Sequence, residues 1–307
     1  MTAPPALRKP VWLRRPLGQG VGRAGLREGL ERLGLRTICQ EGRCPNQGEC
    51  FGRGVATFLV MGDVCTRDCR FCAVKSGRPA PLDPEEPCRV AVQVAAMGLR
   101  FVVVTSVTRD DLADGGAGHL AAVALALKAR CPGLGVELLV PDFRGNAQAL
   151  ATVLASRPQV LAHNLETVPR LAGRVRPAAR HERSLELLAR AKALDPGQIT
   201  KSGLMLGLGE TPGEVRQVMA ELRDAGCDLL TLGQYLSPGP GHHPVAEYIT
   251  PQAFAEHAQA AREMGFAAVA SGPLVRSSYL AEHYYRQVAP PGGEAAPAPQ
   301  AQPTHGI

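Results

Sequence analysis

Six of the nine cysteines in this 307-residue chain fall into two groups of three. The first group has the spacing Cys-x4-Cys-x5-Cys and consists of Cys39, Cys44 and Cys50. The second has the spacing Cys-x3-Cys-x2-Cys and consists of Cys65, Cys69 and Cys72. A disulfide framework is disfavoured by the odd total and by an N-terminus without the apolar segment of a secretory signal. Structural zinc takes four ligands, commonly from two close cysteine pairs, whereas three thiolates suit a cubane iron–sulfur cluster with one iron open or otherwise held.

An iron with an open coordination position gives such a cluster a chemical use. It can chelate the amino and carboxylate groups of S-adenosylmethionine and pass an electron to the sulfonium, which yields a carbon radical. General acid–base catalysis contributes about 10²–10⁴-fold and does not break unactivated C–H bonds, so a cofactor must carry that step. The tighter spacing of the second group makes it the stronger candidate for this cluster.

From residue 55 to 272 the sequence alternates strand-like and helix-like segments. Nearly continuous apolar runs, typical of strands buried on both faces, predict strands at 56–63, 101–107, 135–140, 160–167, 202–208 and 228–236. Amphipathic stretches predict helices near 86–97, 118–130, 146–155, 181–193, 213–225 and 251–264. Six such repeats indicate parallel strands with right-handed crossovers, in an open or partial barrel or in a doubly wound sheet. In both folds the chemistry lies at the carboxyl ends of the strands.

Polar residues recur at those expected strand ends. The second cysteine group follows the first strand, and TRDDLADGG follows the second. His163, Asn164 and Glu166 end the fourth, where the last two alternate with Leu165 and can point into one cavity. The fifth strand runs into GLGE and the sixth into GQYLSPGPG. One edge of the sheet is therefore expected to carry an active site.

These motifs, in their order, resemble a known family. CTRDCRFC resembles the signature of radical S-adenosylmethionine enzymes, with Phe71 as the aromatic residue beside the adenine. TICQEGRCPNQGEC resembles the auxiliary-cluster motif of the lipoyl synthase family. Other stretches between about Lys9 and Tyr279 are similar to that family: RKPVWLR, TSVTRDDLADGGA, HNLETV, KSGLMLGLGET, LTLGQYL and VASGPLVRSSY. The resemblance covers nearly the whole folded chain.

The resemblance implies two 4Fe–4S clusters. The catalytic cluster, which binds S-adenosylmethionine, would be held by Cys65, Cys69 and Cys72. An auxiliary cluster would be held by Cys39, Cys44, Cys50 and the second serine of Arg-Ser-Ser-Tyr, Ser278. A serine alkoxide is a harder ligand for iron than a thiolate, so Ser278, which the family also makes part of the catalytic set, suits a cluster that comes apart. Taken alone, the two serines of that motif would indicate a polar turn.

The family also implies residues that bind S-adenosylmethionine or line the substrate site. Besides Phe71 they are Asp114, Gly115, Gly116, Asn164, Glu166, Gly203, Met205, Gly207 and Glu210. Glycine permits close approach of the backbone to a ligand, although Asp-Gly-Gly by itself is more often a turn. Weaker candidates within family motifs are Lys201, Gln234 and Arg276.

The fold implied by the family is α/β, a partial (β/α)6 barrel of the radical S-adenosylmethionine type with N- and C-terminal extensions. We predict a basic extension at 1–54 that carries the auxiliary cysteines, the barrel at 55–272, a segment with the serine ligand at 273–288 and a disordered tail at 289–307.

The reaction implied by the family is the insertion of two sulfur atoms at carbons 6 and 8 of an octanoyl group. That group would be amide-linked to a lysine of a lipoyl carrier protein, such as the glycine-cleavage H protein or an acyltransferase lipoyl domain. Two molecules of S-adenosylmethionine would be cleaved, and the auxiliary cluster would give up the sulfur. Further expected partners are a ferredoxin or flavodoxin reductant and an iron–sulfur cluster carrier.

Charge and hydropathy disfavour other classes of protein. Residues 1–36 hold eight basic and two acidic side chains, which accounts for the whole net charge of +6. The basic excess therefore belongs to an N-terminal arm and does not indicate nucleic-acid binding. We expect the arm to be a loosely structured extension; the alternative, which the resemblance suggests, is that residues 8–36 help to steer acidic lipoyl carrier domains. No apolar run approaches the roughly 20 residues that span a bilayer, so we expect a cytoplasmic protein without a membrane partner.

Two regions depart from the family pattern. VRPAARHERS has Ala178, Arg180 and His181 where the family has Gly, an acid and Tyr, and the loop at 237–244 is rich in Gly. Both changes can alter carrier docking or substrate approach. The adjacent His242 and His243 are expected to be exposed to solvent. The three cysteines in or beside helices are expected to be small buried apolar residues: Cys88, Cys131 and Cys227.

Two alternatives remain for the function. One is another radical sulfur-insertion enzyme, of the biotin synthase or methylthiotransferase kind, against which the first cysteine group and the Arg-Ser-Ser-Tyr motif stand. The other is an iron–sulfur or zinc protein with a structural or sensing role, which has no need of Phe71 or of polar strand ends.

Overall fold

The computed structural model describes residues 8–14 and 22–289. Within them, eight strands form one sheet in the order β1-β2-β5-β6-β7-β8-β9-β10. Their bounds are Arg36–Thr37 (β1), Thr57–Val60 (β2), Phe101–Ser106 (β5), Gly135–Leu139 (β6), Val160–Ala162 (β7), Ile199–Leu206 (β8), Leu229–Gln234 (β9) and Ala268–Gly272 (β10). β1 pairs antiparallel with β2, and the other neighbours are parallel. A second sheet pairs β3 (Val64–Cys65) with β4 (Lys75–Ser76).

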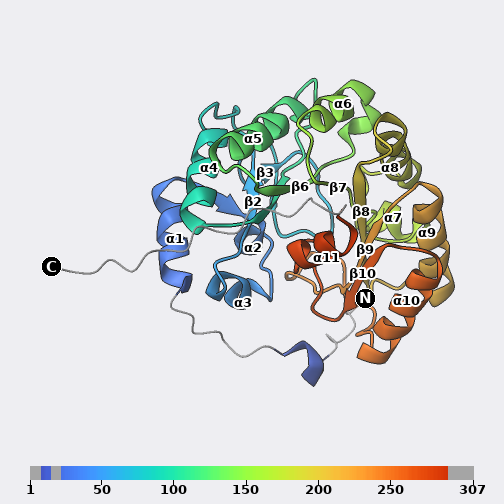
Figure 1. Ribbon diagram of the computed structural model, residues 1–307. Coiled ribbons are helices and arrows are strands. Elements are labelled where there is room, and N and C mark those ends of the chain that lie inside the picture. The colour runs from blue at the N-terminus through green and yellow to red at the C-terminus, as the bar shows by residue number, and fades with distance from the viewer. Residues whose placement is uncertain (1–7, 15–21, 290–307) are drawn as a thin grey trace.

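Helices follow the parallel strands and cover the outer face of the sheet (Figure 1). Those of the outer layer are α4 (Glu86–Met97), α5 (Ala117–Arg130), α6 (Ala147–Ala155), α8 (His181–Leu194), α9 (Pro212–Asp224) and α10 (Pro251–Glu263). The others are α1 (Gly22–Arg32), α2 (Ile38–Glu41), α3 (Gln47–Gly52), α7 (Pro169–Val175) and α11 (Ala281–Val288), with 3-10 turns at η1 (Val11–Leu13) and η2 (Phe143–Gly145). Among the described helices, none is long and apolar enough to cross a membrane.

The parallel strands follow one another across the sheet in chain order. A doubly wound sheet would instead reverse its strand order at one point, and this sheet does not. The order is linear, so the sheet is an open, partial barrel, and the predicted fold class is confirmed. Each of the six predicted strands and six predicted helices has a counterpart. β10 adds a seventh parallel strand and β1 an antiparallel one, neither of which the apolar pattern indicated.

The prediction of a strand over 160–167 is too long. β7 ends at Ala162, and Glu166 adopts a left-handed backbone with φ +67°. Glu166 returns to the sheet through one bridge to Leu204 in β8. The chain then begins α7, which the sequence analysis missed, with Pro169 at a helix start that needs no backbone N–H.

The N-terminal arm is more ordered than predicted. Leu26 and Leu30, four residues apart on one face of α1, are 6% and 1% exposed. α1 packs through this face against α3 and α4. The expectation of a loosely structured extension is wrong for this helix. The free energy gained by burying an apolar pair at helical spacing exceeds the free-energy cost of ordering the charged residues around it. The predicted tail lies, from residue 290 onward, outside the described residues.

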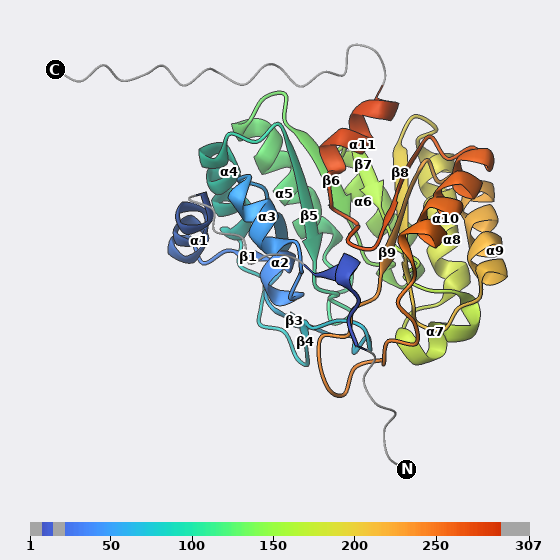
Figure 2. The same cartoon turned by 90° about the horizontal axis from the view of Figure 1, so that it is seen from below.

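α11 closes the amino end of the barrel. Its buried Ala281 and half-buried Tyr284 and Tyr285 pack on the first residues of several strands, including Phe101 and Leu229. The ring centroids of Phe101 and Tyr285 lie 5.1 Å apart. Figure 2 shows α11 at the end of the sheet opposite to β3 and β4. The carboxyl ends of the strands are thereby left as the accessible end of the barrel.

Candidate active site

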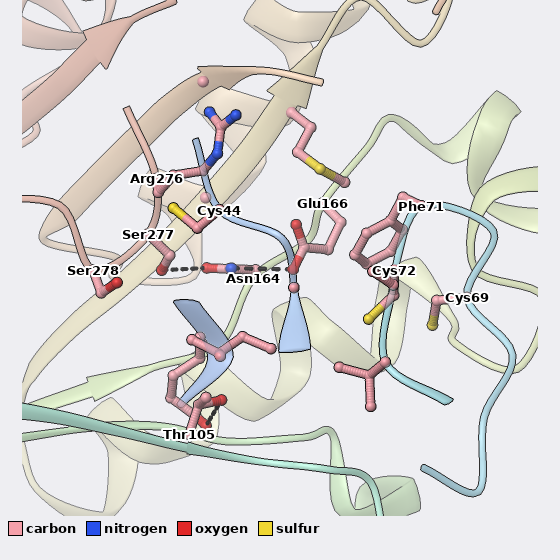
Figure 3. A pocket seen from close by; sticks show the side chains of 18 of the residues that line it. Cys44, Cys69, Phe71, Cys72, Thr105, Asn164, Glu166, Arg276, Ser277 and Ser278 are labelled. Carbon is pink, nitrogen blue, oxygen red and sulfur yellow. Dashed lines mark hydrogen bonds between the residues drawn. The ribbon is translucent and has the colours of Figure 1, made fainter. Parts of the chain in front are cut away.

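A cavity of about 580 Å³ lies at the carboxyl ends of the strands. Five of the six grouped cysteines line it: Cys39, Cys44, Cys65, Cys69 and Cys72. Predicted cofactor residues that line it are Phe71, Asn164, Glu166, Gly203 and Met205. The C-terminal segment adds Arg276, Ser277 and Ser278. Figure 3 shows Cys69, Cys72 and Phe71 on one side of this cavity and Cys44 with Ser277 and Ser278 on the other.

The Cys65 group lies on the loop between β3 and β4. The Cys65 sulfur accepts hydrogen bonds from the backbone N–H groups of Arg67 and Thr108, at 3.4 and 3.3 Å. Burial raises the pKa of the Cys69 thiol to about 12 and that of Cys72 to about 11. Such thiols release protons when they bind iron, because the ligand is the thiolate.

A buried ion-pair network fixes this loop to the strand ends. Arg67 Nε donates to Asp110 Oδ2 at 2.7 Å, and its Nη2 donates to Asp142 Oδ1 at 2.6 Å. The side chains of Arg67 and Asp142 are 5% and 0% exposed. Although burial opposes it, the Arg67 guanidinium holds the pKa of Asp142 at about 2. The loop is therefore tied through charge to the segments that follow β5 and β6.

The Cys39 group depends on residues from both ends of the chain. The Thr57 hydroxyl lies 2.7 Å from Ser278 Oγ and also bonds the Cys39 thiol. Asn46 Nδ2 donates to the carbonyl of Leu274 at 2.6 Å. Burial raises the pKa of Cys39 and brings that of Cys50 to about 12. Ser278, which stands more than 200 residues after these cysteines in the sequence, lines the same cavity as Cys39 and Cys44.

The donor sets fit iron–sulfur clusters better than single metal ions. Across residues 8–14 and 22–289, no three His, Cys, Asp or Glu side chains converge as the ligands of one ion would. In a cubane cluster each thiolate binds a different iron, so the sulfurs need not converge. Within each group the thiolates are close enough for their charges to interact. Three soft ligands line the cavity in the Cys65 group, and Cys39 and Cys44 line it in the other; soft thiolates of this kind are the ligands that a cluster uses.

Asn164 connects the two sides of the cavity. Ser277 Oγ donates to Asn164 Oδ1 at 3.2 Å, and Asn164 Nδ2 donates to Glu166 Oε1 at 3.1 Å (Figure 3). A Cβ at Gly203 would collide with the side chains of Thr231 and Asn164, so glycine is needed there. Burial raises the pKa of Glu166, and nearby Arg176 opposes that shift. This hydrogen-bonded row holds the C-terminal segment against the strand ends.

Comparisons with known proteins show the family of this chain. The model of the Radical SAM superfamily matches residues 59–222. A lipoyl synthase of Caldanaerobacter subterraneus subsp. tengcongensis is 55% identical over 277 residues, which are 90% of this chain and 96% of that protein. A lipoyl synthase of Thermus thermophilus is 53% identical over 90% of this chain and 86% of its own length. This chain belongs to the lipoyl synthase family. Family membership confirms the resemblance seen in the motifs and makes the chain a radical S-adenosylmethionine enzyme.

Solved structures support the fold alone. The crystal structure of methylornithine synthase superposes with a TM-score of 0.51 at 14% identity, over 82% of this chain and 83% of that one. At such low identity the likeness shows the shared partial barrel and says nothing of the substrate.

Some residues that the family implied lie outside the cavity lining. Asp114 accepts hydrogen bonds from the backbone N–H groups of Gly116 and Gly118, at 2.9 and 2.8 Å, at the start of α5. Glu210 accepts from the backbone N–H groups of Gly207 and Leu208. These contacts shape the loops after β5 and β8. Contact of Asp114, Gly115, Gly116, Gly207 and Glu210 with S-adenosylmethionine stays a prediction.

Of the three weaker candidates, two line the cavity and one does not. Lys201 Nζ donates to both oxygens of Glu137, at 2.8 and 2.9 Å, and the two side chains are 2% and 1% exposed. Lys201 is therefore absorbed in a buried ion pair within the barrel and does not line the cavity. Gln234 and Arg276 do line it. Arg67 and Asp142 were missed, although Arg67 stands inside the quoted cysteine motif.

Two further expectations are wrong. His242 and His243 are half-buried, and their Nε2 atoms lie 3.1 Å from the carbonyls of Cys72 and Leu208, because the 237–244 loop folds over the cysteine loop. Cys227 is buried as expected, but Cys131 is half-buried and Cys88 is exposed on α4. Cys88 lies next to the core-facing Pro87 and Val90, so its own position faces away from the core.

Proposed function

We propose that this chain inserts two sulfur atoms, at carbons 6 and 8, into an octanoyl group carried by a lipoyl carrier protein. Bound S-adenosylmethionine and two 4Fe–4S clusters supply the carbon radical and the sulfur. The observation that carries the proposal is the opening of both cysteine groups, together with Ser278, on one cavity. A structural or sensing cluster needs no second group across a cavity from the first.

The chain's own residues hold, orient and shield the reactants. Cys65, Cys69 and Cys72 hold the catalytic cluster, and Cys39, Cys44, Cys50 and Ser278 hold the auxiliary one. Phe71 and Met205 offer apolar surface to the adenosyl group on the catalytic side. The acyl chain would lie between the two sides, where the lining includes Leu59, Val107, Leu139, Val140 and Val275. An apolar wall excludes water, which protects a reactive radical.

The same proposal includes the remaining partners. A ferredoxin or flavodoxin would reduce the clusters, and a cluster carrier would rebuild the auxiliary one after its sulfur is spent. The glycine-cleavage H protein and acyltransferase lipoyl domains are the acyl carriers we propose, and the cytoplasm is the compartment.

The test is anaerobic reconstitution with heavy-isotope sulfide, removal of the excess, and incubation with an octanoyl-lysine peptide, S-adenosylmethionine and dithionite. Mass spectrometry should show a product that gains two labelled sulfur atoms as the dithiol, and that loses two hydrogens when it is afterwards oxidised to the disulfide. Each chain should yield about one product without a cluster carrier, because the cofactor's own atoms are consumed. Unlabelled product, or many turnovers without a sulfur source, would contradict the sacrificial role of the auxiliary cluster.

A further inference from the structure

Charged residues line both the rim and the interior of the cavity, and only in the interior do both signs occur, where Arg67, Arg176 and Arg276 accompany the acids. The two exposed ones are cationic, Lys9 and Arg43. The two acidic ones, Asp142 and Glu166, are not exposed, and Asp142 is taken up by Arg67. Over the described part of the chain, the mouth of the cavity therefore presents positive charge and no exposed carboxylate of its own lining.

Apolar surface lies beside this charge. η1 begins two residues after Lys9. Its Val11 and Trp12 are 72% and 42% exposed, whereas Leu13 is fully buried and fixes the turn to the protein. Figure 2 shows η1 in front of the region between α2 and β9. Exposed apolar side chains next to a binding cavity, rimmed by charge, are typical of an interaction site. We call the set Arg8, Lys9, Val11, Trp12, Arg14 and Arg43 the rim surface.

Arg43 fixes the opposite part of the rim. Its Nη1 donates to the carbonyl of Pro238 at 3.0 Å, which joins the loop of the Cys39 group to the 237–244 loop. Arg43 has a left-handed backbone with φ +50°, and its neighbour Cys44 lines the cavity. The rim surface is thus built from segments that also shape the site.

Two other basic residues of the N-terminal arm lie away from the cavity. Arg27 and Arg32 are exposed on α1, which packs on α3 and α4, and neither lines the cavity. Arg15 lies outside the described residues. Charge close to the mouth and charge on α1 can therefore be changed separately.

We propose that the rim surface docks the carrier protein, through acidic side chains that surround its acyl-lysine. This inference rests on the proposed function. An acyl-lysine that reaches the cavity leaves the body of its carrier at the mouth, where it meets Lys9, Arg43 and the apolar pair of η1. Trp12 becomes buried on binding and anchors the contact. The cations raise the association rate and make it depend on salt.

The chain offers its own probe, because Trp12 is its single tryptophan. The reconstituted protein is titrated anaerobically with a tryptophan-free octanoylated carrier, and quenching of Trp12 emission by acrylamide is measured. We expect the carrier to protect Trp12 and a short neutral octanoyl-peptide to leave it quenched. Product formation from both substrates is measured in parallel.

Charge variants complete the test. Lys9→Glu should raise the Kd of the carrier about tenfold at low salt, with the effect lost at high salt. The matched control, Arg27→Glu with Arg32→Glu, changes more charge and should shift Kd by less than about twofold, because α1 lies away from the mouth. Trp12→Ala should weaken the carrier's binding and leave the peptide's product yield the same.

The outcomes separate the docking inference from the proposed function. If both substrates give product but the carrier leaves Trp12 open to acrylamide, or if the α1 control weakens binding as much as Lys9→Glu, the rim surface is not the docking site. If neither substrate gives product, the proposed function fails. If the carrier then still protects Trp12 from acrylamide, the rim surface binds carriers for a different reaction, and the inference is overturned.

Discussion

The two cysteine groups share a cavity but are held in place by different forces. The Cys65 group is fixed by backbone N–H bonds to sulfur and by the buried pairs of Arg67 with Asp110 and Asp142. The Cys39 group is fixed by single hydrogen bonds that join the two ends of the chain: between Thr57 and Ser278, between Asn46 and Leu274, and from Tyr279 to Glu49. Removing one partner of a buried ion pair costs about 3–5 kcal/mol, whereas a neutral hydrogen bond contributes about 0.5–1.5 kcal/mol.

The different forces that hold the two cysteine groups suit the different roles proposed for their clusters. A cluster that must return to the same geometry in each reaction needs a rigid loop, and charge buried behind that loop supplies it. A cluster that gives up its sulfur needs surroundings that can open and close. Buried polar atoms without a hydrogen-bond partner in the described part of the chain occur on both sides, Asn46 Oδ1 and Gln47 Nε2 on this one and Ser106 Oγ and Arg109 Nη1 at or just after the end of β5, so the contrast rests on the ion pairs alone.

The largest effects should come from removing one cysteine of each group. Cys69→Ala and Cys44→Ala should each lose about half of the iron that the reconstituted protein binds. Cys69→Ala should also lose cleavage of S-adenosylmethionine, because its cluster carries the electron. Cys44→Ala should still release 5′-deoxyadenosine from S-adenosylmethionine but form no lipoyl product. Equal loss of cleavage in both variants would show that the two groups do not act separately.

The next prediction concerns the charge behind the Cys65 loop. Arg67→Met leaves Asp142 without its closest partner in a buried site and should cost about 3–5 kcal/mol of stability, measured by denaturant unfolding. The matched control is Arg170→Met, which breaks a bidentate pair with Glu214 at 2.6 and 2.9 Å on the surface. That control should leave the unfolding midpoint nearly unchanged. A similar loss in the two variants would remove the basis for calling the Cys65 side the rigid one.

Features that depend on local sequence patterns could be predicted, and contacts between distant segments could not. Both cysteine groups, the strands and the outer helices follow from local patterns, because spacing and apolar period are local properties. The network of Arg67 does not, since its partners Asp110 and Asp142 stand on two other loops that only the barrel brings together. Lys201 was misplaced for the same reason, because its partner Glu137 lies two strands away, across β7. β10 was missed because Ala268–Gly272 is short and has Val269 as its one β-branched residue among small ones.

A smaller effect should appear as a dependence of stability on pH. His163 is fully buried behind the Cys65 side, where Nδ1 lies 2.9 Å from the carbonyl of Val140 and Nε2 lies 2.9 Å from Ser184 Oγ. Burial, with the nearby charge of Arg176, lowers the pKa of His163 from 6.5 to about 4.

Between pH 6.5 and pH 4 the unfolded chain therefore binds a proton that the folded chain does not. Stability should fall as the pH is lowered through this window, by an amount on the order of 3 kcal/mol. His163→Gln should flatten the unfolding free energy over the same window. Asp142, whose pKa is lowered from 3.8 to about 2, loses its contribution mainly as the pH falls between these two values, below most of that window. An unchanged slope in the variant would assign the pH dependence to other groups.

The smallest effect should come from the single hydroxyl that joins the ends of the chain at the Cys39 group. Thr57→Val keeps the shape of the side chain and removes the contacts with Ser278 and Cys39, so stability should fall by about 1 kcal/mol. The matched control is Thr105→Val, because both threonines line the cavity and the Thr105 hydroxyl bonds only a backbone carbonyl, that of Leu139, at 3.0 Å. The two variants should lose similar stability, yet only Thr57→Val should lower lipoyl product per 5′-deoxyadenosine formed, since Ser278 loses its partner there. If the product ratio falls equally in both, the hydroxyl of Thr57 only packs, and the neutral contacts at this end of the cavity have no part in positioning the serine.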